Sequence, residues 1–229
     1  MSNYCDGVTD PTSSDTPTRN DTPTRNDTPD NLHRGGDDRL RCAWGVSTPD
    51  YIEYHDIEWG RPVTDERTLF EKLCLEGFQS GLSWLTILRK RENFRAAFAN
   101  FDAAIVANFG EPDVLRLLDD PGIVRHRGKI EASINNARAA VGLHSEGSSL
   151  AELFWAHRPS IERAPTSFGD VPAKTDESAA LAKELKRRGF RFVGPTTAYA
   201  AMQAMGVVND HLAQCWVREA CEAARPRRN

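Results

Sequence analysis

The stretch LLDDPGIVRHRGKIEASINNA, residues 117–137, decides the fold class of this chain because it predicts two helices joined by a short turn. Pro121 and Gly122 end the first helix, and Gly122 can turn the chain while leaving backbone N–H groups free to meet a phosphate. A cluster of basic side chains follows, formed by Arg125, His126, Arg127 and Lys129. A helix–hairpin–helix of this kind binds the phosphate backbone of DNA without sequence-specific contacts to the bases. The alternative is a plain helical hairpin whose basic turn is solvated.

Helical patterns continue on both sides of the hairpin, and they predict an all-α fold class. Residues 64–77 carry acidic side chains in the first turn and apolar side chains at helical spacing, and residues 82–101 repeat that pattern. Further helices are expected at 102–109, 112–120, 127–144, 149–157, 175–189, 195–206 and 210–224. Strand-like alternation is nearly absent, and RFVG at 191–194 is the only short candidate. No linker after residue 41 is long enough to separate independent domains, so we expect one bilobal helical unit.

Residues 1–40 differ from the rest in composition and are predicted to form a disordered, low-complexity tail. They contain the direct repeat DTPTRN DTPTRN, which starts at Asp15, and almost no large apolar side chains that could offset the ordering entropy. The folded helical domain is therefore expected to span residues 41–229. The tail holds eight Asp and four Arg, so the net charge of −4 belongs to it and the remainder is neutral. A neutral domain neither excludes nor demands nucleic acid binding, which would need local basic patches.

The sequence contains no signal for membrane insertion or secretion. No run of eighteen apolar residues exists, so no transmembrane helix is expected, and the first residues lack the basic start and apolar run of a secretory signal. We therefore expect a cytoplasmic protein with no membrane partner. The five cysteines are odd in number and would lie in a reducing compartment, which favours metal binding or simple burial over disulfides.

Cysteine and histidine pairs near both ends of the expected domain form a candidate metal site. Cys42 and His55 have the spacing Cys-x12-His, while His211 and Cys215 in NDHLAQC lie four residues apart, on one face if that segment is helical. Two thiolates and two imidazoles make a closed tetrahedral zinc shell with no position for a catalytic water. The metal would then be structural and would tie the start of the domain to its last helix. The alternative is that all four are ordinary core side chains, since Cys-x12-His is no standard finger spacing.

Glu76 is the candidate ligand-binding acid. With Leu69 placed at zero and about 100° per residue, Leu73 lies near 40° and Glu76 near −20°, so the carboxyl is on the apolar face of its helix. A carboxyl there either pairs with a neighbouring charge or backbone group, or recognises a ligand. Many aromatic residues lie near it in the sequence: Trp44, Tyr51, Tyr54, Trp59, Phe78 and Trp84. They form either plain core, or a pocket for a flat cationic or electron-poor ring whose N–H edge bonds the carboxylate.

These residues and their order resemble the 3-methyladenine DNA glycosylase I (Tag) family. The matching stretches cover most of residues 41–215: RCAWG, YIEYHDIEWG, LEGFQSGLSW, LRKRENFRAAF, GIVRHRGKI, KRRGFRFVGPTTAY and MQAMGVVNDHLAQC. The resemblance implies the fold of the helix-hairpin-helix glycosylase superfamily and one structural zinc held by Cys42, His55, His211 and Cys215. It also implies that a flipped base is held by Glu76, Trp44, Tyr51, Tyr54, Trp59 and Trp84. Phe78 stands where the family often has Gln, a departure that could alter the pocket or a DNA contact.

The activity that this resemblance implies is excision of 3-methyladenine, with 3-methylguanine as a second candidate, from alkylated double-stranded DNA. Water attacks the sugar and leaves an abasic site, while Glu76 recognises the base edge rather than acting as a nucleophile. The family lacks the catalytic aspartate of its superfamily relatives, which makes sense because the methylated base is positively charged and leaves readily. Leu82 matches the loop that fills the gap in the duplex. The expected contacts to the DNA backbone are Gly122, Arg125, Arg127 and Lys129, and a monomer is expected.

Three other functions remain open at this point. A non-catalytic, zinc-stabilised protein that binds damaged DNA would keep the hairpin and the metal, but would not need an acid on an apolar face beside aromatic residues. A zinc hydrolase would need an open metal position, which four protein ligands do not leave. A bifunctional lyase would need a lysine placed at the sugar, and the sequence does not identify one.

Overall fold

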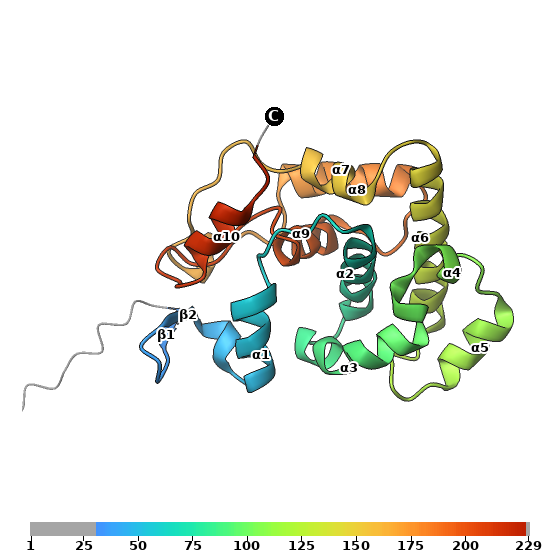
Figure 1. Ribbon diagram of the computed structural model, residues 1–229, viewed down its shortest axis with the longest axis horizontal. Coiled ribbons are helices and arrows are strands. Elements are labelled where there is room, and N and C mark those ends of the chain that lie inside the picture. The colour runs from blue at the N-terminus through green and yellow to red at the C-terminus, as the bar shows by residue number, and fades with distance from the viewer. Residues whose placement is uncertain (1–30, 228–229) are drawn as a thin grey trace, which may run out of the picture.

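Helices dominate the structure, a computed structural model that describes residues 31–227 (Figure 1). The α-helices of this part of the chain are α1 (Pro49–Glu53), α2 (Glu66–Gln79), α3 (Trp84–Ala97), α4 (Ala103–Val106), α5 (Glu111–Asp119), α6 (Arg127–Ser145), α7 (Leu150–Ala156), α8 (Asp176–Arg187), α9 (Pro195–Ala204) and α10 (Arg218–Ala224). Short 3₁₀ or π turns are η1 (Ala43–Val46), η2 (Tyr54–Glu58), η3 (Ala99–Phe101) and η4 (Phe168–Asp170). The all-α class is confirmed. Within residues 31–227, no helix combines the length and apolar character needed to cross a membrane.

Helix α2 is the central element of the larger core. Its residues 69–78 are all buried, and it contacts α3, α6, α7 and α9. Because neighbouring helices cover α2 on every side, even its charged residues Glu71, Lys72 and Glu76 are buried. Phe78 is 1% exposed and packs against Phe94 with ring centroids 4.6 Å apart. It faces the core and does not line the cavity, so any effect of Phe78 on the pocket would pass through the packing of α2.

A short β-hairpin corrects the predicted start of the folded chain. Strand β1 (Leu32–Arg34) pairs antiparallel with β2 (Leu40–Cys42), and Leu32 lies opposite Cys42. Folded structure thus begins before residue 41, because strands of three residues are too short to show alternation in a sequence. The one strand candidate of the sequence, residues 191–194, is instead the loop between α8 and α9. Residues 1–30 of the predicted tail lie outside the described residues.

A second, smaller apolar cluster joins the two ends of the described chain and gives the fold its predicted bilobal form. Its members come from the hairpin and from the segment around α10: Leu32, Cys42, Leu212, Cys215, Val217 and Cys221. The larger core is built from α2 to α9. Figure 1 shows the β-hairpin, α1 and α10 on one side, with α2, α3 and α6 on the other.

The predicted last helix over 210–224 is wrong in its first half, because α10 begins only at Arg218. His211 and Cys215 lie in turns before it, not on one helical face. Several backbone groups of these turns bond to side chains, although the N–H of Cys215 still donates to the carbonyl of Leu212. The Arg218 guanidinium donates to the carbonyls of Asn209 and His211, and the N–H of Leu212 donates to Sγ of Cys42 at 3.4 Å. Such bonds compete with helix formation.

The helix–hairpin–helix forms as predicted from α5 and α6, joined by residues 120–126. The ring of His126 accepts the N–H of Lys129 and so caps the start of α6. The N–H of Gly122 donates to Oδ1 of Asp120 at 2.7 Å. The N–H of Gly122 itself is therefore used by the preceding turn and is not available to a phosphate.

Candidate active site and metal centre

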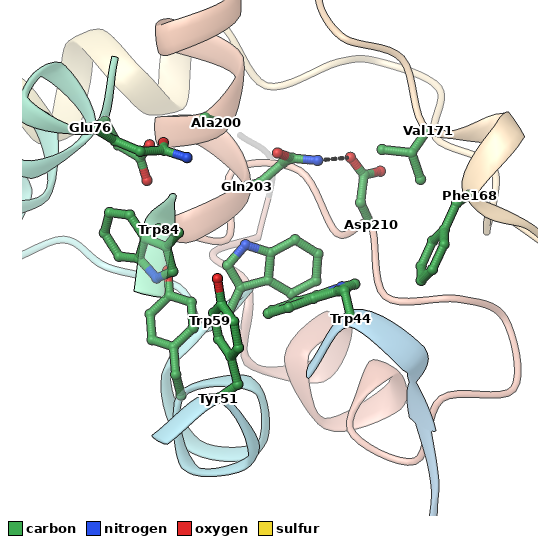
Figure 2. A pocket seen from close by; sticks show the side chains of 12 residues that line it. Trp44, Tyr51, Trp59, Glu76, Trp84, Phe168, Val171, Ala200, Gln203 and Asp210 are labelled. Carbon is green, nitrogen blue, oxygen red and sulfur yellow. Dashed lines mark hydrogen bonds between the residues drawn. The ribbon is translucent and has the colours of Figure 1, made fainter. Parts of the chain in front are cut away.

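A cavity of about 350 Å³ lies where the two lobes meet, and it is lined by every aromatic residue predicted for the pocket (Figure 2). Segment 43–59 contributes Trp44, Tyr51, Tyr54 and Trp59, while α2 contributes Glu76 and α3 contributes Trp84. A volume at the low end of the range for ligand pockets suits one flat ring rather than a large ligand.

The indole of Trp44 is the centre of the aromatic wall. It meets Trp59 edge to face with ring centroids 4.9 Å apart, and Tyr51 in the same way at 5.8 Å. Beside them, the rings of Tyr54 and Trp84 lie 5.4 Å apart. Each ring is held by its neighbour, so the faces turned to the cavity keep a fixed position. Fixed aromatic faces can stack on a planar cation. The Nε1 group of Trp84 is buried without a hydrogen-bond partner, which leaves one unused donor in this wall.

Glu76 supplies the buried acid of the cavity and is 6% exposed. Burial raises the pKa of its carboxyl to about 8, against a smaller lowering by Lys72. Lys72, one turn earlier on α2, donates to Glu58 instead of Glu76. Within the described chain no group forms a hydrogen bond with the Glu76 carboxyl. The alternative of a salt bridge or a cap is therefore not what the structure contains. At neutral pH this is a protonated acid whose oxygens are available to a ligand.

We predict that Glu76 makes the protein less stable as pH rises. The folded state holds one more proton than the unfolded state between the ordinary pKa of 4.5 and the folded value of about 8. The free energy of unfolding therefore falls through this window by about 1.4 kcal/mol per pH unit from this group. Urea unfolding at pH 5 and pH 9 should show the unmodified protein losing several kcal/mol more than Glu76→Gln, which cannot titrate. Parallel pH curves for the two proteins would show that the carboxyl is not desolvated.

The cavity also contains residues that the sequence patterns did not single out: Gln79, Phe168, Val171, Ala200, Gln203 and Asp210. Gln79 lies three residues after Glu76 on α2, so helical spacing alone could have found it. Asp210 directly precedes His211 in the sequence. Phe168 and Val171 lie in the long segment after α7, and no pattern in the sequence connects them to the cavity.

The four predicted metal ligands meet in one buried cluster of Cys42, His55, His211 and Cys215, with all ligand atoms within 4.8 Å of one another. Sγ of Cys215 lies 3.4 Å from Nε2 of His55 and 3.6 Å from Nδ1 of His211. Sγ of Cys42 lies 4.0 Å from Nδ1 of His211. The edges of a tetrahedral zinc site with such ligands are roughly 3.3–3.8 Å long. The cluster therefore has the size and the donor set of a closed Cys₂His₂ metal site.

The outer nitrogens of both histidine rings are already bonded. Nδ1 of His55 lies 2.8 Å from Oδ1 of Asp56, and Nε2 of His211 lies 3.0 Å from the carbonyl of Trp59. These bonds leave Nε2 of His55 and Nδ1 of His211 to face the centre of the cluster. Asp56 is itself held by Arg41 at 2.8 Å. A carboxylate or carbonyl behind each ring is the support that metal-binding histidines need.

The two thiols of the cluster differ in their readiness to lose a proton. A hydrogen bond from the Cys42 thiol holds the pKa of Cys215 far below its usual range, and the nearby rings of His211 and His55 add to this effect. The same pairing, together with burial, raises the pKa of Cys42. Cys215 is therefore the thiol that loses its proton more readily, and a divalent cation bound by both sulfurs would displace the protons that remain. The residues fit a metal ion on size, donor chemistry and outer support.

The loop between α2 and α3 lies against the start of α6. Nζ of Lys129 donates to the carbonyls of Phe78 at 2.8 Å and Ser80 at 2.6 Å. Lys129 is only 7% exposed, so its ammonium closes the end of α2. This placement reassigns Lys129 from a phosphate contact to a structural role. Leu82, two residues after Ser80, is 41% exposed. Leu82, which is predicted to fill the gap in the duplex, therefore lies at the surface next to the hairpin.

The two arginines of the hairpin differ in their surroundings. Arg127 forms ion pairs with Glu111 at 2.9 Å and with Glu131 at 3.2 Å. Arg125 is exposed, and the described residues provide no ion-pair partner for it. A phosphate must compete with two carboxylates for Arg127 but not for Arg125. Arg125 is therefore the better candidate for a backbone contact.

We predict that Arg125→Ala weakens binding to every duplex alike and lowers the slope of log K against log salt by about one. Arg127→Ala should have a smaller effect, because two carboxylates already neutralise that guanidinium. Fluorescence anisotropy of a labelled duplex at several salt concentrations measures both. A larger loss for Arg127→Ala than for Arg125→Ala would contradict the assignment.

A helix–hairpin–helix beside a base-sized aromatic cavity that holds a buried acid defines the class of helix–hairpin–helix DNA glycosylases. The family model described as methyladenine glycosylase matches residues 44–219 of this sequence. The chain therefore belongs to the methyladenine glycosylase family.

Two named proteins and a solved structure that are similar to this chain support its assignment to this family. DNA-3-methyladenine glycosylase 1 of Escherichia coli (strain K12) is 51% identical over 178 residues, which are 76% of this chain and 95% of that protein. DNA-3-methyladenine glycosylase of Haemophilus influenzae (strain ATCC 51907 / DSM 11121 / KW20 / Rd) is 46% identical over 178 residues, which are 76% of this chain and 96% of that protein. A solved structure of a 3-methyladenine DNA glycosylase I in complex with 3-methyladenine matches with a TM-score of 0.74 at 34% identity, covering 82% of this chain and 99% of that one.

Proposed function

We propose that this protein hydrolyses the N-glycosidic bond of 3-methyladenine in alkylated double-stranded DNA and so begins base excision repair. The observation that carries the proposal is Glu76, a buried acid without a hydrogen-bond partner beside a fixed aromatic wall. The names of the relatives, and the neighbour solved with 3-methyladenine, support this choice of substrate.

The chemistry needs little from the protein, because N3-methylation places a positive charge on the base while it is attached to deoxyribose. The bond from C1′ to N9 breaks, and its electron pair moves to the base, which leaves as neutral 3-methyladenine. Water adds to C1′ and loses a proton, which leaves an abasic site. The protein must extrude the base, hold it and favour separation of the products.

Glu76 and the aromatic wall provide that hold. The protonated carboxyl can donate one hydrogen bond and accept another, and an arriving cation favours its ionised form. The aromatic faces stack on the charged ring. An undamaged base offers neither the charge nor a good leaving group, so both binding and chemistry select the methylated base. Leu82 would fill the space that the flipped nucleotide leaves in the duplex.

We also propose that Cys42, His55, His211 and Cys215 hold one structural Zn²⁺. Four protein ligands leave no place for a water molecule, so the chemistry belongs to the cavity and not to the metal. The cation would join the β-hairpin to the segment before α10. We propose that the protein acts as a monomer in the cytoplasm, because one chain supplies the whole cavity and DNA is the substrate.

Release of free base from a methylated duplex tests the proposal. Purified, zinc-loaded protein should release 3-methyladenine, which is measured by chromatography of the soluble fraction. Binding without any release would instead support a non-catalytic protein that senses damaged DNA. Borohydride added during the reaction should trap no covalent adduct with DNA, because hydrolysis by water forms no Schiff base. A trapped adduct would show that the protein is a lyase.

A further inference from the structure

Gln203 of α9 is a polar residue of the cavity whose side chain is held in one orientation. Its Nε2 donates to Oδ2 of Asp210 at 2.8 Å, and the hydroxyl of Tyr199 donates to the same oxygen at 2.6 Å. Gln203 and Asp210 both line the cavity that contains Glu76. Figure 2 shows the amide of Gln203 between Asp210 and Glu76, with the bond to Asp210 drawn.

The carboxylate determines which end of this amide the cavity meets. Oδ2 of Asp210 accepts from the Tyr199 hydroxyl and from Nε2 of Gln203, so the amide turns its NH₂ group toward Asp210. The carbonyl oxygen Oε1 then points the other way, toward the side of Glu76, as Figure 2 shows. Without Asp210, the amide could rotate by half a turn at little cost, because its two ends have nearly the same shape.

Tyr199 keeps Asp210 in place. Burial, and then the bond to Asp210, raises the pKa of the Tyr199 hydroxyl, so it remains a donor at any pH near neutral. Both bonds fall on Oδ2 of Asp210, so the carboxylate is anchored by the same two residues of α9, Tyr199 and Gln203. The cavity therefore presents a permanent hydrogen-bond acceptor that belongs to neither the aromatic wall nor Glu76.

We propose that Gln203, oriented by Asp210 and Tyr199, makes the cavity select bases with an amine at position 6 over bases with a carbonyl there. This inference rests on the proposed function and names the part of the base that the site reads. The amine of 3-methyladenine has two hydrogens, which suffice for Glu76 and for Oε1 of Gln203. The O6 of 3-methylguanine would meet the lone pairs of Oε1, and two facing acceptors repel each other.

The first test is Gln203→Met, which keeps the length of the side chain but removes the acceptor. Release of 3-methyladenine and 3-methylguanine is measured from one methylated duplex. We expect the ratio of the two rates to fall by about tenfold, the value of one well-placed hydrogen bond. If the unmodified protein releases neither base, the proposed function fails. If it releases 3-methyladenine and Gln203→Met leaves the ratio unchanged, the inference alone fails.

A second test uses free bases and needs no catalysis. The fluorescence of the cavity tryptophans reports binding of 3-methyladenine, which has an amine at position 6, and of 3-methylhypoxanthine, which has a carbonyl there. The unmodified protein should bind the amine form more tightly, and Gln203→Met should lose about tenfold of that preference. Equal binding of the two bases by the unmodified protein would overturn the inference.

The role of Asp210 as a positioning residue is tested by Asp210→Ala, which frees the amide to turn. We expect the preference between the two free bases to relax toward that of Gln203→Met, while binding of 3-methyladenine itself weakens less. Tyr199→Phe removes one of the two hydrogen bonds to Asp210. Its preference between the two free bases should lie between that of Asp210→Ala and that of the unmodified protein. Metal content is measured in each variant, because Asp210 adjoins His211. An unchanged preference in Asp210→Ala protein that retains one metal ion would contradict the positioning role.

Discussion

Glu76→Gln should reduce release of 3-methyladenine by roughly 10- to 100-fold, the effect of losing hydrogen bonds to a charged group. Affinity for an undamaged duplex should stay within about twofold, because Glu76 is 6% exposed inside the cavity and the backbone contacts lie on the hairpin. A glutamine has the same shape but cannot become the anion that pairs with a cationic base. Single-turnover release and duplex binding, measured on the same preparation, separate the two effects.

Glu71→Gln is the matched control for that experiment. Glu71 lies on the same helix, is 8% exposed and pairs with Arg95 at 2.7 Å, but it does not line the cavity. The change should lower stability modestly, because it removes the ion pair with Arg95, which is half-buried and keeps its second partner Glu92. The preference for the methylated base should not change. Equal losses of base selectivity in both variants, or a loss of undamaged duplex binding in Glu76→Gln, would contradict the role given to Glu76.

Cys215→Ser should remove the metal ion and lower the free energy of unfolding by roughly 5 kcal/mol or more, because metal binding of this kind is coupled to folding. Cys215 is the ligand that contacts both histidine rings, at 3.4 and 3.6 Å. A serine hydroxyl at that position is a weak zinc ligand. Loss of the ion would separate the β-hairpin from the segment before α10, so the protein should open first at these two ends.

Cys221→Ser is the control for the metal experiment. Cys221 is also a fully buried cysteine of the smaller apolar cluster, but it does not belong to the four-residue site. Elemental analysis should find one zinc per chain in Cys221→Ser and in the unmodified protein, and none in Cys215→Ser. A Cys215→Ser protein that keeps its full zinc and its stability would show that the shell is not the one described.

The sequence predicted those features that depend on local spacing. The wheel of α2 correctly placed Glu76 on a buried face, although every residue from Leu69 to Phe78 is buried, and the hairpin between α5 and α6 follows from Pro121 and the apolar positions around it. The spacing of the Cys and His pairs left ordinary core side chains open as an alternative, and the family resemblance selected the ligand set. The local geometry of His211 and Cys215 could not be predicted in this way, because a spacing of four residues fits both a helix and a turn. The bond from Arg218 to the backbone of this segment also leaves no trace in the spacing.

Features that depend on tertiary contact were missed or misassigned. Lys129 is a surface cation by composition, but its ammonium is buried against the end of α2 by packing between helices distant in sequence. The acceptor on Gln203 exists only because Asp210, on another segment, fixes the amide. Both positions lie in stretches that resemble the family, but no spacing within those stretches assigns either side chain the contacts it makes. Such arrangements arise from how elements meet, which a pattern along one chain does not encode.

The central claim is that the cavity of Glu76 holds the excised base, and a crystal structure of the zinc-loaded protein with free 3-methyladenine tests it most directly. We predict the purine ring against the indoles of Trp44 and Trp59, with its amine within hydrogen-bond distance of Glu76 and of Oε1 of Gln203. Density for the base at any other site, or a base in the cavity whose amine points away from Glu76, would contradict the account.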